Sequence, residues 1–242
     1  MAIPDSRVQH AYRVRVSLLL LAVIVATVVL AVGYQGIYTL SVLDAVEHAR
    51  DHWQQPVAVI EPLKLKNGSV VADIGSGAGY FTLKIAPMVG QEGRVFDVDI
   101  LKEPLAFLWV RALLRHESNV HIIHTDPDNP HLPEGRIDAV LVANTCHEFM
   151  QPRTVLNHVF QALHPGGRLV VVDRGPLPAD QESGELEARH HEVHPSAVES
   201  DLREMGFDVI SRSDLFIDLP AVGRPGDRPD NHPWWLIVAR KP

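Results

Sequence analysis

The stretch Val70-Val71-Ala72-Asp73-Ile74-Gly75-Ser76-Gly77-Ala78-Gly79-Tyr80-Phe81 places an apolar, β-type run directly before three alternating glycines. The pattern predicts a strand, a tight turn and the start of a helix. Glycine lets the backbone N–H groups of a turn approach a ligand, and the helix that follows directs its partly positive N-terminus at the same place. The stretch is therefore typical of a nucleotide-binding turn, although an ordinary glycine-rich turn between a strand and a helix gives the same pattern.

Apolar runs alternate with amphipathic stretches along the chain that surrounds this turn. Residues 41–58 are compatible with helix, and Pro56 is placed to start a new one. Strands and helices that alternate at this length imply a parallel sheet with helices on both faces and the ligand at the carboxyl ends of the strands. The expected strands are 69–74, 94–98, 120–124, 137–142, 168–172, one that begins at 207, and 234–240, and the expected helices are 79–88, 103–115, 152–163 and 195–205.

Composition narrows the classes of function. The 242 residues carry a formal net charge of −8, which argues against a nucleic-acid backbone as the main partner because phosphate binding calls for clustered Lys and Arg. Cys146 is the single cysteine, so an intrachain disulfide and a four-cysteine zinc site are excluded. The length and the 46% of hydrophobic residues suit one globular domain plus a short extension.

The extension is an apolar segment near the N-terminus, because no charged residue occurs between Val16 and Leu43. As a helix, residues 16–34 would span roughly 28 Å, close to the thickness of the hydrocarbon core of a bilayer. We therefore expect an uncleaved transmembrane anchor. A signal peptide with a small-residue site at residues 31–33 is the main alternative, and a buried core helix is a second one.

Charges on the two sides of this segment bear on its orientation. Arg7, Arg13 and Arg15 precede it, whereas Arg50 is the single Lys or Arg in the twenty positions after Tyr34. This bias favours an N-terminus in the cytoplasm and a folded domain on the other side of the membrane. The expected division of the chain is a basic segment at 1–15, an anchor at 16–34, a helical lead-in at 35–66 and a folded domain at 67–242.

Spacing separates two kinds of nucleotide site. The dinucleotide fingerprint G-x-G-x-x-G would need glycine where the chain has Tyr80, and the observed pattern from Asp73 to Gly79 is D-x-G-x-G-x-G. Asp99 lies twenty positions beyond Gly79 at the end of the next expected strand, where its carboxylate can accept two hydrogen bonds from ribose hydroxyls. Asp97 is the neighbouring alternative, although it sits before the end of that strand.

At these residues the chain resembles the class I S-adenosylmethionine-dependent methyltransferases. It is most similar to a small-molecule-type subgroup whose members often begin with a signal or anchor and a W-Q-x-P segment, here Trp53 to Pro56. The resemblance implies a Rossmann-like, doubly wound sheet of seven strands with the last strand antiparallel. Besides the glycine stretch, it is carried by R-V-F-D-V-D-I at 94–100, N-V-H-I-I-H-T-D at 119–126, D-A-V-L-V-A-N-T-C-H-E-F at 138–149 and L-H-P-G-G-R-L at 163–169.

The resemblance also implies S-adenosyl-L-methionine as cofactor and assigns its contacts. Asp99 would hold the ribose and Asp126 the adenine ring, with Asp128 as an alternative for the adenine. Asn144 follows the fourth strand, where the cofactor and substrate pockets of the family meet. The methionine moiety would be held by the glycine stretch, through Asp73, Gly75, Ser76, Gly77 and Gly79.

The chemistry asks little of the protein, because a sulfonium methyl is already activated and catalysis is mainly in-line positioning, with a base where an O–H or N–H must lose its proton. His147, Glu148 and Asp173 follow strands four and five on the expected substrate side and are the candidate catalytic residues. His147 is alternatively a packing or hydrogen-bonding residue, and Glu148 a capping or solvated one. Cys146 is expected to be a small buried side chain and not a nucleophile, since methyl transfer needs no covalent enzyme intermediate.

The run His190-His191-Glu192-x-His194 invites a metal site, but Pro195 marks a helix start there, and we expect solvated or substrate-loop histidines and no metal. The sequence as a whole predicts a membrane-anchored methyltransferase that acts on a small or lipid-like molecule. A non-enzymatic cofactor-binding module at the membrane and a nicotinamide oxidoreductase are the alternatives. The supply of S-adenosylmethionine favours a cytoplasmic domain, against the charge bias, and the oligomeric state stays open.

Overall fold

The computed structural model describes residues 6–176, 193–217 and 233–242. The chain divides into two units, Met1–Val46 and Glu47–Pro242. Helix α1 (Ser6–Gln54) begins in the first unit and ends in the second, so that its last two turns belong to the folded domain.

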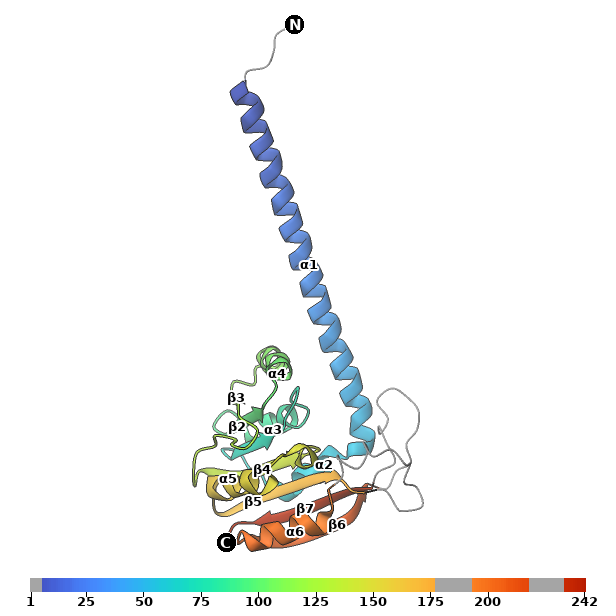
Figure 1. Cartoon of the computed structure of the whole chain (residues 1–242), viewed down its shortest axis with the longest axis vertical. Coiled ribbons are helices and arrows are strands. Elements are labelled where there is room, and N and C mark those ends of the chain that lie inside the picture. The colour runs from blue at the N-terminus through green and yellow to red at the C-terminus, as the bar shows by residue number, and fades with distance from the viewer. Residues whose placement is uncertain (1–5, 177–192, 218–232) are drawn as a thin grey trace. The chain divides into compact units, whose positions relative to one another are not determined.

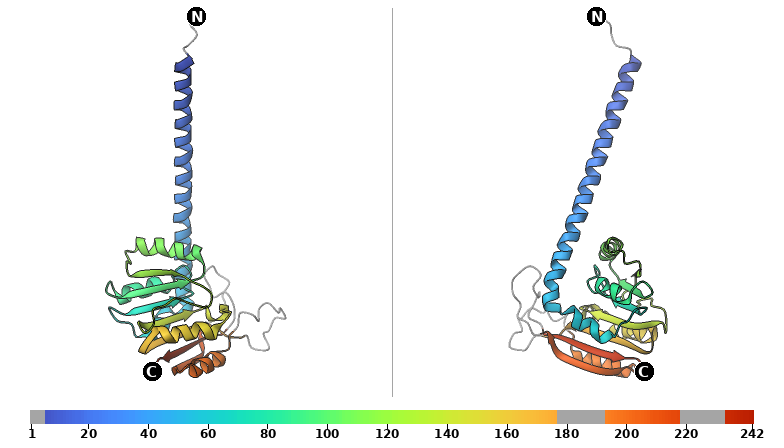
Figure 2. Two further views of the ribbon diagram at one scale, coloured as in Figure 1. Left: turned by 60° about the vertical axis from the view of Figure 1, so that its left-hand side comes forward. Right: turned by 180° about the vertical axis from the view of Figure 1, so that it is seen from behind.

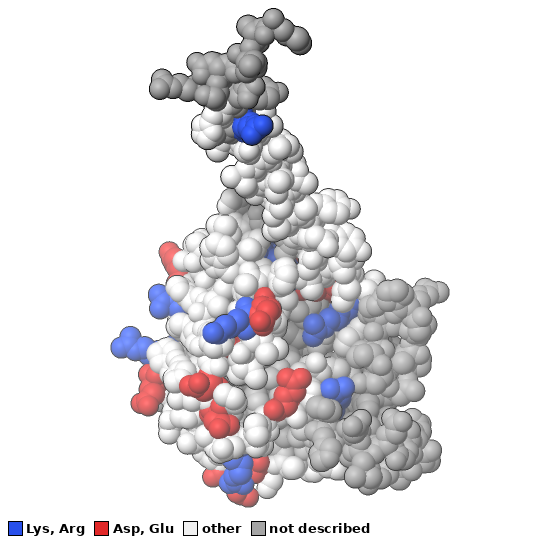
Figure 3. All heavy atoms as spheres, turned by 45° about the horizontal axis from the view of Figure 1, so that its top comes forward, with Lys and Arg blue, Asp and Glu red and all other residues white. Residues whose placement is uncertain are grey.

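One helical segment in the described part of the chain, Arg15–Gln54, is long and apolar enough to cross a membrane. None of its most apolar stretch of 18 residues is buried. The uncharged part of this helix, residues 16–43, appears in Figure 3 as a white stretch that follows a basic side chain near the start of the helix. Its length and composition are those of a membrane span or of a signal sequence.

Seven strands form one sheet in the order β3-β2-β1-β4-β5-β7-β6 (Figure 1). The pairs β1–β2, β1–β4, β2–β3 and β4–β5 are parallel, whereas β7 is antiparallel to both β5 and β6. The expected Rossmann-like sheet with its last strand antiparallel is confirmed. The strands are β1 (Val70–Ile74), β2 (Arg94–Asp99), β3 (Val120–His124), β4 (Ile137–Ala143), β5 (Leu163–Arg174), β6 (Asp208–Ile217) and β7 (Trp234–Arg240).

Helices cover both faces of the sheet, as the two views of Figure 2 show. Successive side chains of a strand point to opposite faces, so Val71 packs with Ile85 on one face while Ala72 packs with Leu156 and Leu202 on the other. Helices α2, α3 and α4 therefore lie on the first face and α5 and α6 on the second. The helices are α2 (Pro56–Ile60), α3 (Thr82–Val89), α4 (Lys102–Leu114), α5 (Pro152–Ala162) and α6 (Pro195–Glu204), with short 3-10 turns at Glu61–Leu63 and Cys146–Glu148.

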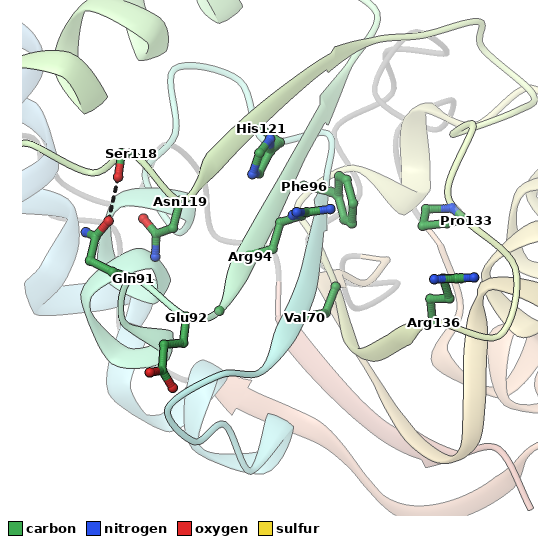
Figure 4. Close-up of a pocket in the computed structure, with 11 residues that line it drawn as sticks. Val70, Gln91, Glu92, Arg94, Phe96, Ser118, Asn119, His121, Pro133 and Arg136 are labelled. Atoms are coloured by element: carbon green, nitrogen blue, oxygen red, sulfur yellow. Dashed lines mark hydrogen bonds between the residues drawn. The ribbon is translucent and has the colours of Figure 1, made fainter.

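No helix connects β3 to β4, whereas a doubly wound sheet usually has one there. The loop that replaces it leaves part of the sheet face uncovered, and a hollow of about 540 Å³ forms at the amino ends of the strands. Arg94, Phe96, His121 and Arg136 line it (Figure 4). This hollow lies at the edge of the sheet opposite to the glycine turn, so we do not assign the cofactor to it.

Candidate functional site

The glycine turn follows β1 and has three residues in the left-handed region, with φ of +70° at Gly75, +57° at Gly77 and +84° at Gly79. A Cβ atom at Gly75 would lie 2.1 Å from Cγ2 of Thr145, and one at Gly79 would lie 2.3 Å from Cδ1 of Leu108. A Cβ atom at Gly77 would meet nothing within 4 Å. Two of the glycines are thus required by packing inside the domain, and the third has open space above it.

Asp99 is the last residue of β2 and holds this turn in place. Its Oδ2 accepts a hydrogen bond from the backbone N–H of Gly77 at 2.8 Å, and its Oδ1 accepts one from the N–H of Leu101 at 2.8 Å. The side chain is largely buried, with 9% of the residue exposed. Each carboxylate oxygen can accept a further hydrogen bond, which is the capacity that a pair of ribose hydroxyls requires.

Asp97 and Asp73 precede the ends of their strands and lie opposite each other on the paired strands β2 and β1. Both carboxyls contact the hydroxyl of Thr82, at 2.7 Å from Asp73 Oδ2 and 2.8 Å from Asp97 Oδ1. A hydroxyl donates only one proton, so one of the two carboxyls must itself be protonated and donate to Thr82. Burial raises the pKa of Asp73 to about 6 and that of Asp97 to about 8, which places the shared proton on Asp97 at neutral pH.

Asp126, the expected adenine residue, lies beyond the end of β3 and is exposed. Its Oδ2 is 3.0 Å from Nε2 of His131. The preceding Thr125 donates its N–H to the backbone carbonyl of Asp99 at 3.0 Å, which brings the ends of β2 and β3 together. Asp128, the alternative, instead accepts a hydrogen bond from Gln151 at 3.2 Å.

The residues after β4 pack under the glycine turn. Asn144 has a φ of +55° and donates its backbone N–H to Val172 at 2.8 Å. Thr145 donates its hydroxyl to the carbonyl of Gly75 or of Ala143, at 3.2 and 3.1 Å. Sequence reasoning missed Thr145 and Thr82, because an isolated threonine carries no motif and its role depends on which strands lie side by side.

His147 is buried between Asp173 and Arg174. Its Nδ1 is 2.8 Å from Oδ1 of Asp173, its backbone N–H donates to Oδ2 of the same carboxylate at 3.0 Å, and Nη2 of Arg174 is 2.9 Å from its Nε2. Arginine only donates, so Nε2 must be the acceptor and Nδ1 must carry the proton. Both ring nitrogens are therefore engaged, an arrangement that supports the hydrogen-bonding interpretation over a base role.

The two neighbours of His147 differ from each other in exposure. Glu148 is exposed, with Oε1 3.6 Å from Nε2 of His147. Cys146 is buried, and this burial raises the pKa of its thiol well above the ordinary value, which keeps the sulfur protonated and unreactive.

His194 is the residue before α6, and residues 190–192 lie outside the described residues. Within those described residues no group of three side chains suitable for a metal ion occurs.

Comparisons with known proteins agree with this geometry. A family described as "Methyltransferase domain" matches residues 72–171, which include the glycine turn, β2, β4 and most of β5. Ubiquinone/menaquinone biosynthesis C-methyltransferase UbiE of Azotobacter vinelandii is 30% identical over 115 residues, or 47% of this chain and 46% of the relative. The family model spans less than half of the chain, and together with these relatives it supports a class I S-adenosylmethionine-dependent methyltransferase.

Further relatives show how far this similarity reaches. Demethylmenaquinone methyltransferase of a Geobacillus species is 24% identical over 54% of this chain and 56% of its own length, so the chain spans about half the length of the curated relatives it matches. A crystal structure of a SAM-dependent methyltransferase from Aquifex aeolicus has a TM-score of 0.63 at 20% identity, covering 83% of this chain and 96% of that one. The [4+2]-cyclase SpnF, at 17% identity over 78% and 80%, has a TM-score of 0.65, so the fold alone does not determine the reaction.

The residues of the methyltransferase domain suit the cofactor that this family uses. The open space at Gly77 lets a ligand approach the backbone of the turn, and Asp99 places a carboxylate beside that space. The nicotinamide alternative lacks support, because the fingerprint glycine is replaced by Tyr80, a buried residue whose ring packs edge-on against Phe81. We expect the methionine moiety above the turn and the ribose at Asp99.

We predict that Asp99→Ala weakens binding of S-adenosylhomocysteine by roughly 2 to 4 kcal/mol, because charge-assisted hydrogen bonds are lost and ribose hydroxyls are left unpaired. Calorimetric titration of the full chain in detergent measures the change. Asp208→Ala, which removes an exposed partner of Arg240, is the control and should bind normally. Unchanged affinity in the Asp99 variant would remove this residue from the site.

We predict that Asp97→Asn flattens the pH dependence of stability. A carboxyl whose pKa is raised by folding binds a proton in the folded state that the unfolded state has lost, so the stability of the wild type should fall as pH rises from about 4 to about 8. Asparagine donates to Thr82 without a titrating proton. Urea denaturation at pH 5 and pH 8 should show a loss of more than about 1 kcal/mol in the wild type and a smaller one in the variant. Equal slopes in the two proteins would contradict the shared proton.

Proposed function

We propose that this protein transfers a methyl group from S-adenosyl-L-methionine to a small or lipid-like acceptor at a membrane. The proposal depends on one observation: the glycine turn has open space at Gly77, with the carboxylate of Asp99 beside it, at the carboxyl ends of the parallel strands. The cofactor, when bound, supplies a methyl group that is already activated by a positively charged sulfur. The protein therefore needs to hold donor and acceptor in line and to keep water away.

The lipid-like acceptor is inferred from two independent features. Two of the curated relatives are named for ubiquinone and menaquinone biosynthesis and for demethylmenaquinone, so methyl acceptors of the quinone type are the first candidates. The apolar helix α1 would keep the protein at a membrane, where such acceptors dissolve. Of the candidate residues at the ends of β4 and β5, we propose that Asn144 and Glu148 border the acceptor, whereas the side chains of His147 and Asp173 are buried.

Titration with S-adenosylhomocysteine and with NAD tests the class of cofactor, and we expect binding of the first and none of the second. Incubation of the full chain with labelled S-adenosylmethionine and a membrane extract should then label a lipid fraction, and a metabolite extract is the parallel sample. Label only in the metabolite sample would favour a water-soluble acceptor. Binding without any transfer would favour the alternative of a non-enzymatic cofactor-binding module.

That alternative has one structural observation in its favour. His147 has no free ring nitrogen in its contacts with Asp173 and Arg174, so a proton acceptor at this position would require Arg174 to move. Methyl transfer to an acceptor that needs no deprotonation would not require such a base. Positioning alone can drive that reaction, and we therefore retain the enzyme as our proposal.

We predict that His147→Asn retains methyl transfer within about tenfold of the wild type, with unchanged affinity for S-adenosylhomocysteine and a loss of about 1 to 3 kcal/mol in stability. The reason is that the side chain links Asp173 to Arg174 inside the domain. Transfer of label from S-adenosylmethionine and urea denaturation measure the two effects. A fall in turnover of about a hundredfold or more with intact cofactor affinity would restore the base role.

The side of the membrane on which the domain lies is tested by reporters fused to Pro242 that are active only inside or only outside the cytoplasm. We expect a single-pass anchor, and the basic residues before it favour an external domain. An internal signal would reverse that orientation and give the enzyme direct access to its donor. Release of a soluble product that begins near Tyr34 would show that α1 is a signal peptide and not an anchor.

A further inference from the structure

The last two turns of α1 are attached to the glycine turn. Both carboxylate oxygens of Glu47 contact the guanidinium of Arg111, and Nη1 of Arg111 also donates to the carbonyl of Ala78 at 2.6 Å. Arg111 is 3% exposed, so these bonds are shielded from water. Trp53 packs edge-on against Trp234 at 5.5 Å between ring centroids and holds the end of α1 in the core. The end of α1, the helix that carries the apolar segment, is thus in direct contact with Arg111 of α4 and, through it, with the glycine turn.

A second set of contacts surrounds Tyr80, the residue after Gly79. The Tyr80 hydroxyl donates to Oδ1 of Asp51 at 2.7 Å, and Nζ of Lys84 lies 2.9 Å from the same oxygen. The Arg50 guanidinium stands over the Tyr80 ring, with Cζ 4.1 Å from the ring centroid. Arg50 is therefore close to the residue that follows the glycine turn, and it interacts electrostatically with the buried carboxyl of Asp73.

Arg50 differs from the other two cations around the turn. Arg111 is paired with Glu47 and Lys84 with Asp51. Arg50 donates through Nε to the uncharged side chain of Gln54, and among the described residues no carboxylate lies within ion-pair distance of it. Burial lowers the pKa of its guanidinium, which shows that the charge has lost part of its hydration.

Glu47, Asp51 and Asp73 offset part of this cost electrostatically, but within the described residues no ion pair joins any of them to Arg50, so its guanidinium can still take a carboxylate in direct contact. The guanidinium presents two parallel N–H groups that match a carboxylate, and stacking on Tyr80 fixes its plane beforehand. S-adenosylmethionine carries adenosine at one end and an α-amino acid at the other. With the ribose at Asp99, we expect the amino-acid end to lie over the open space at Gly77, next to Tyr80.

We propose that Arg50 binds the α-carboxylate of the methyl donor. This inference rests on the proposed function, since it needs S-adenosylmethionine at the turn. It makes the end of α1 part of the binding site and not only an attachment to the membrane. A carboxylate paired with Arg50 would also give a direct ion pair to the cation at the turn that has none within the described residues.

The test compares two ligands that differ only in this carboxylate, S-adenosylmethionine and decarboxylated S-adenosylmethionine. Calorimetric titration uses the full chain in detergent, as wild type, Arg50→Gln and Arg50→Lys. We expect Arg50→Gln to weaken binding of S-adenosylmethionine by about 10 to 100-fold and to leave the decarboxylated ligand within about threefold of the wild type. Arg50→Lys should have an intermediate affinity for S-adenosylmethionine, because lysine keeps the positive charge but lacks the two parallel N–H groups of the guanidinium.

Lys84→Gln is the matched control, since Lys84 also lies over Tyr80, at 4.5 Å, but already has Asp51 as partner. It should change the affinity for the two ligands equally. If Arg50→Gln weakens the binding of both ligands equally, Arg50 only shapes the turn. If it leaves the binding of both ligands unchanged, Arg50 is not part of the site. Either result overturns the inference while the proposed function stands. Failure of the wild type to bind S-adenosylmethionine would overturn the proposed function itself. Retained binding of the decarboxylated ligand reports that each variant is folded.

Discussion

Gly77→Val is expected to abolish measurable binding of S-adenosylhomocysteine while the domain stays folded. A Cβ atom at Gly77 meets no atom within 4 Å, so the branched side chain enters the open space above the turn and not the core. That space is where we place the methionine moiety. We expect the affinity to fall by at least about 100-fold, because no rearrangement of the turn brings the backbone back within reach of the ligand.

The control for this variant is Gly135→Val. Gly135 also has a positive φ, +63°, and open space around it, but it lies in the loop before β4 at the opposite edge of the sheet. Both variants carry the strain of a β-branched residue in the left-handed region, about 1 to 2 kcal/mol. They should therefore lose similar stability in urea, while only Gly77→Val loses ligand binding in calorimetry. Normal binding by Gly77→Val would refute the placement of the cofactor at this turn.

Asp173→Ala is expected to destabilise the domain by about 3 to 5 kcal/mol. Asp173 is fully buried and accepts three hydrogen bonds, from the backbone and the ring of His147 and from the backbone N–H of Arg174. Alanine would leave these donors without an acceptor in a site that water does not reach. Urea denaturation of the full chain in detergent, followed by tryptophan fluorescence, measures the loss.

Asp173→Asn keeps a carbonyl oxygen as acceptor and should lose clearly less stability than the alanine variant. Asp208→Ala at the surface should change stability by no more than about 1 kcal/mol. A loss of under about 1 kcal/mol for Asp173→Ala would mean that the three hydrogen bonds contribute little and that Asp173 serves the acceptor site instead.

Local features of this chain were predictable from its sequence. The strands at Val120–His124 and Trp234–Arg240 have the expected bounds, because a short apolar run between turn residues is itself typical of a strand. The break between α1 and α2 at Gln55, with a φ of 49°, agrees with the expected helix start at Pro56. The position of Asp99 at the end of β2, twenty residues after the glycine turn, was likewise readable from spacing.

Some bounds were wrong because tertiary contacts extend the elements. β5 begins at Leu163, five residues before the expected start, since Leu163 pairs with Ile137 of β4. The bounds of the anchor stay a prediction: α1 continues without interruption past Tyr34, the expected end of the anchor, because a change from apolar to polar side chains does not interrupt backbone hydrogen bonds. Polarity marks where a helix leaves an apolar environment, not where the helix stops.

The sequence by itself therefore determined the order of strands and helices, the glycine turn, the position of Asp99 at the end of β2 and the apolar segment. Each depends on residues close together in the chain, whose types impose a backbone conformation. Only the tertiary structure decided that Thr82 joins Asp73 to Asp97, that His147 is closed between Asp173 and Arg174, and that Arg50 stands at the turn. These side chains meet because non-consecutive strands lie adjacent and the end of α1 packs on the sheet, and no local pattern encodes which distant segments share an edge.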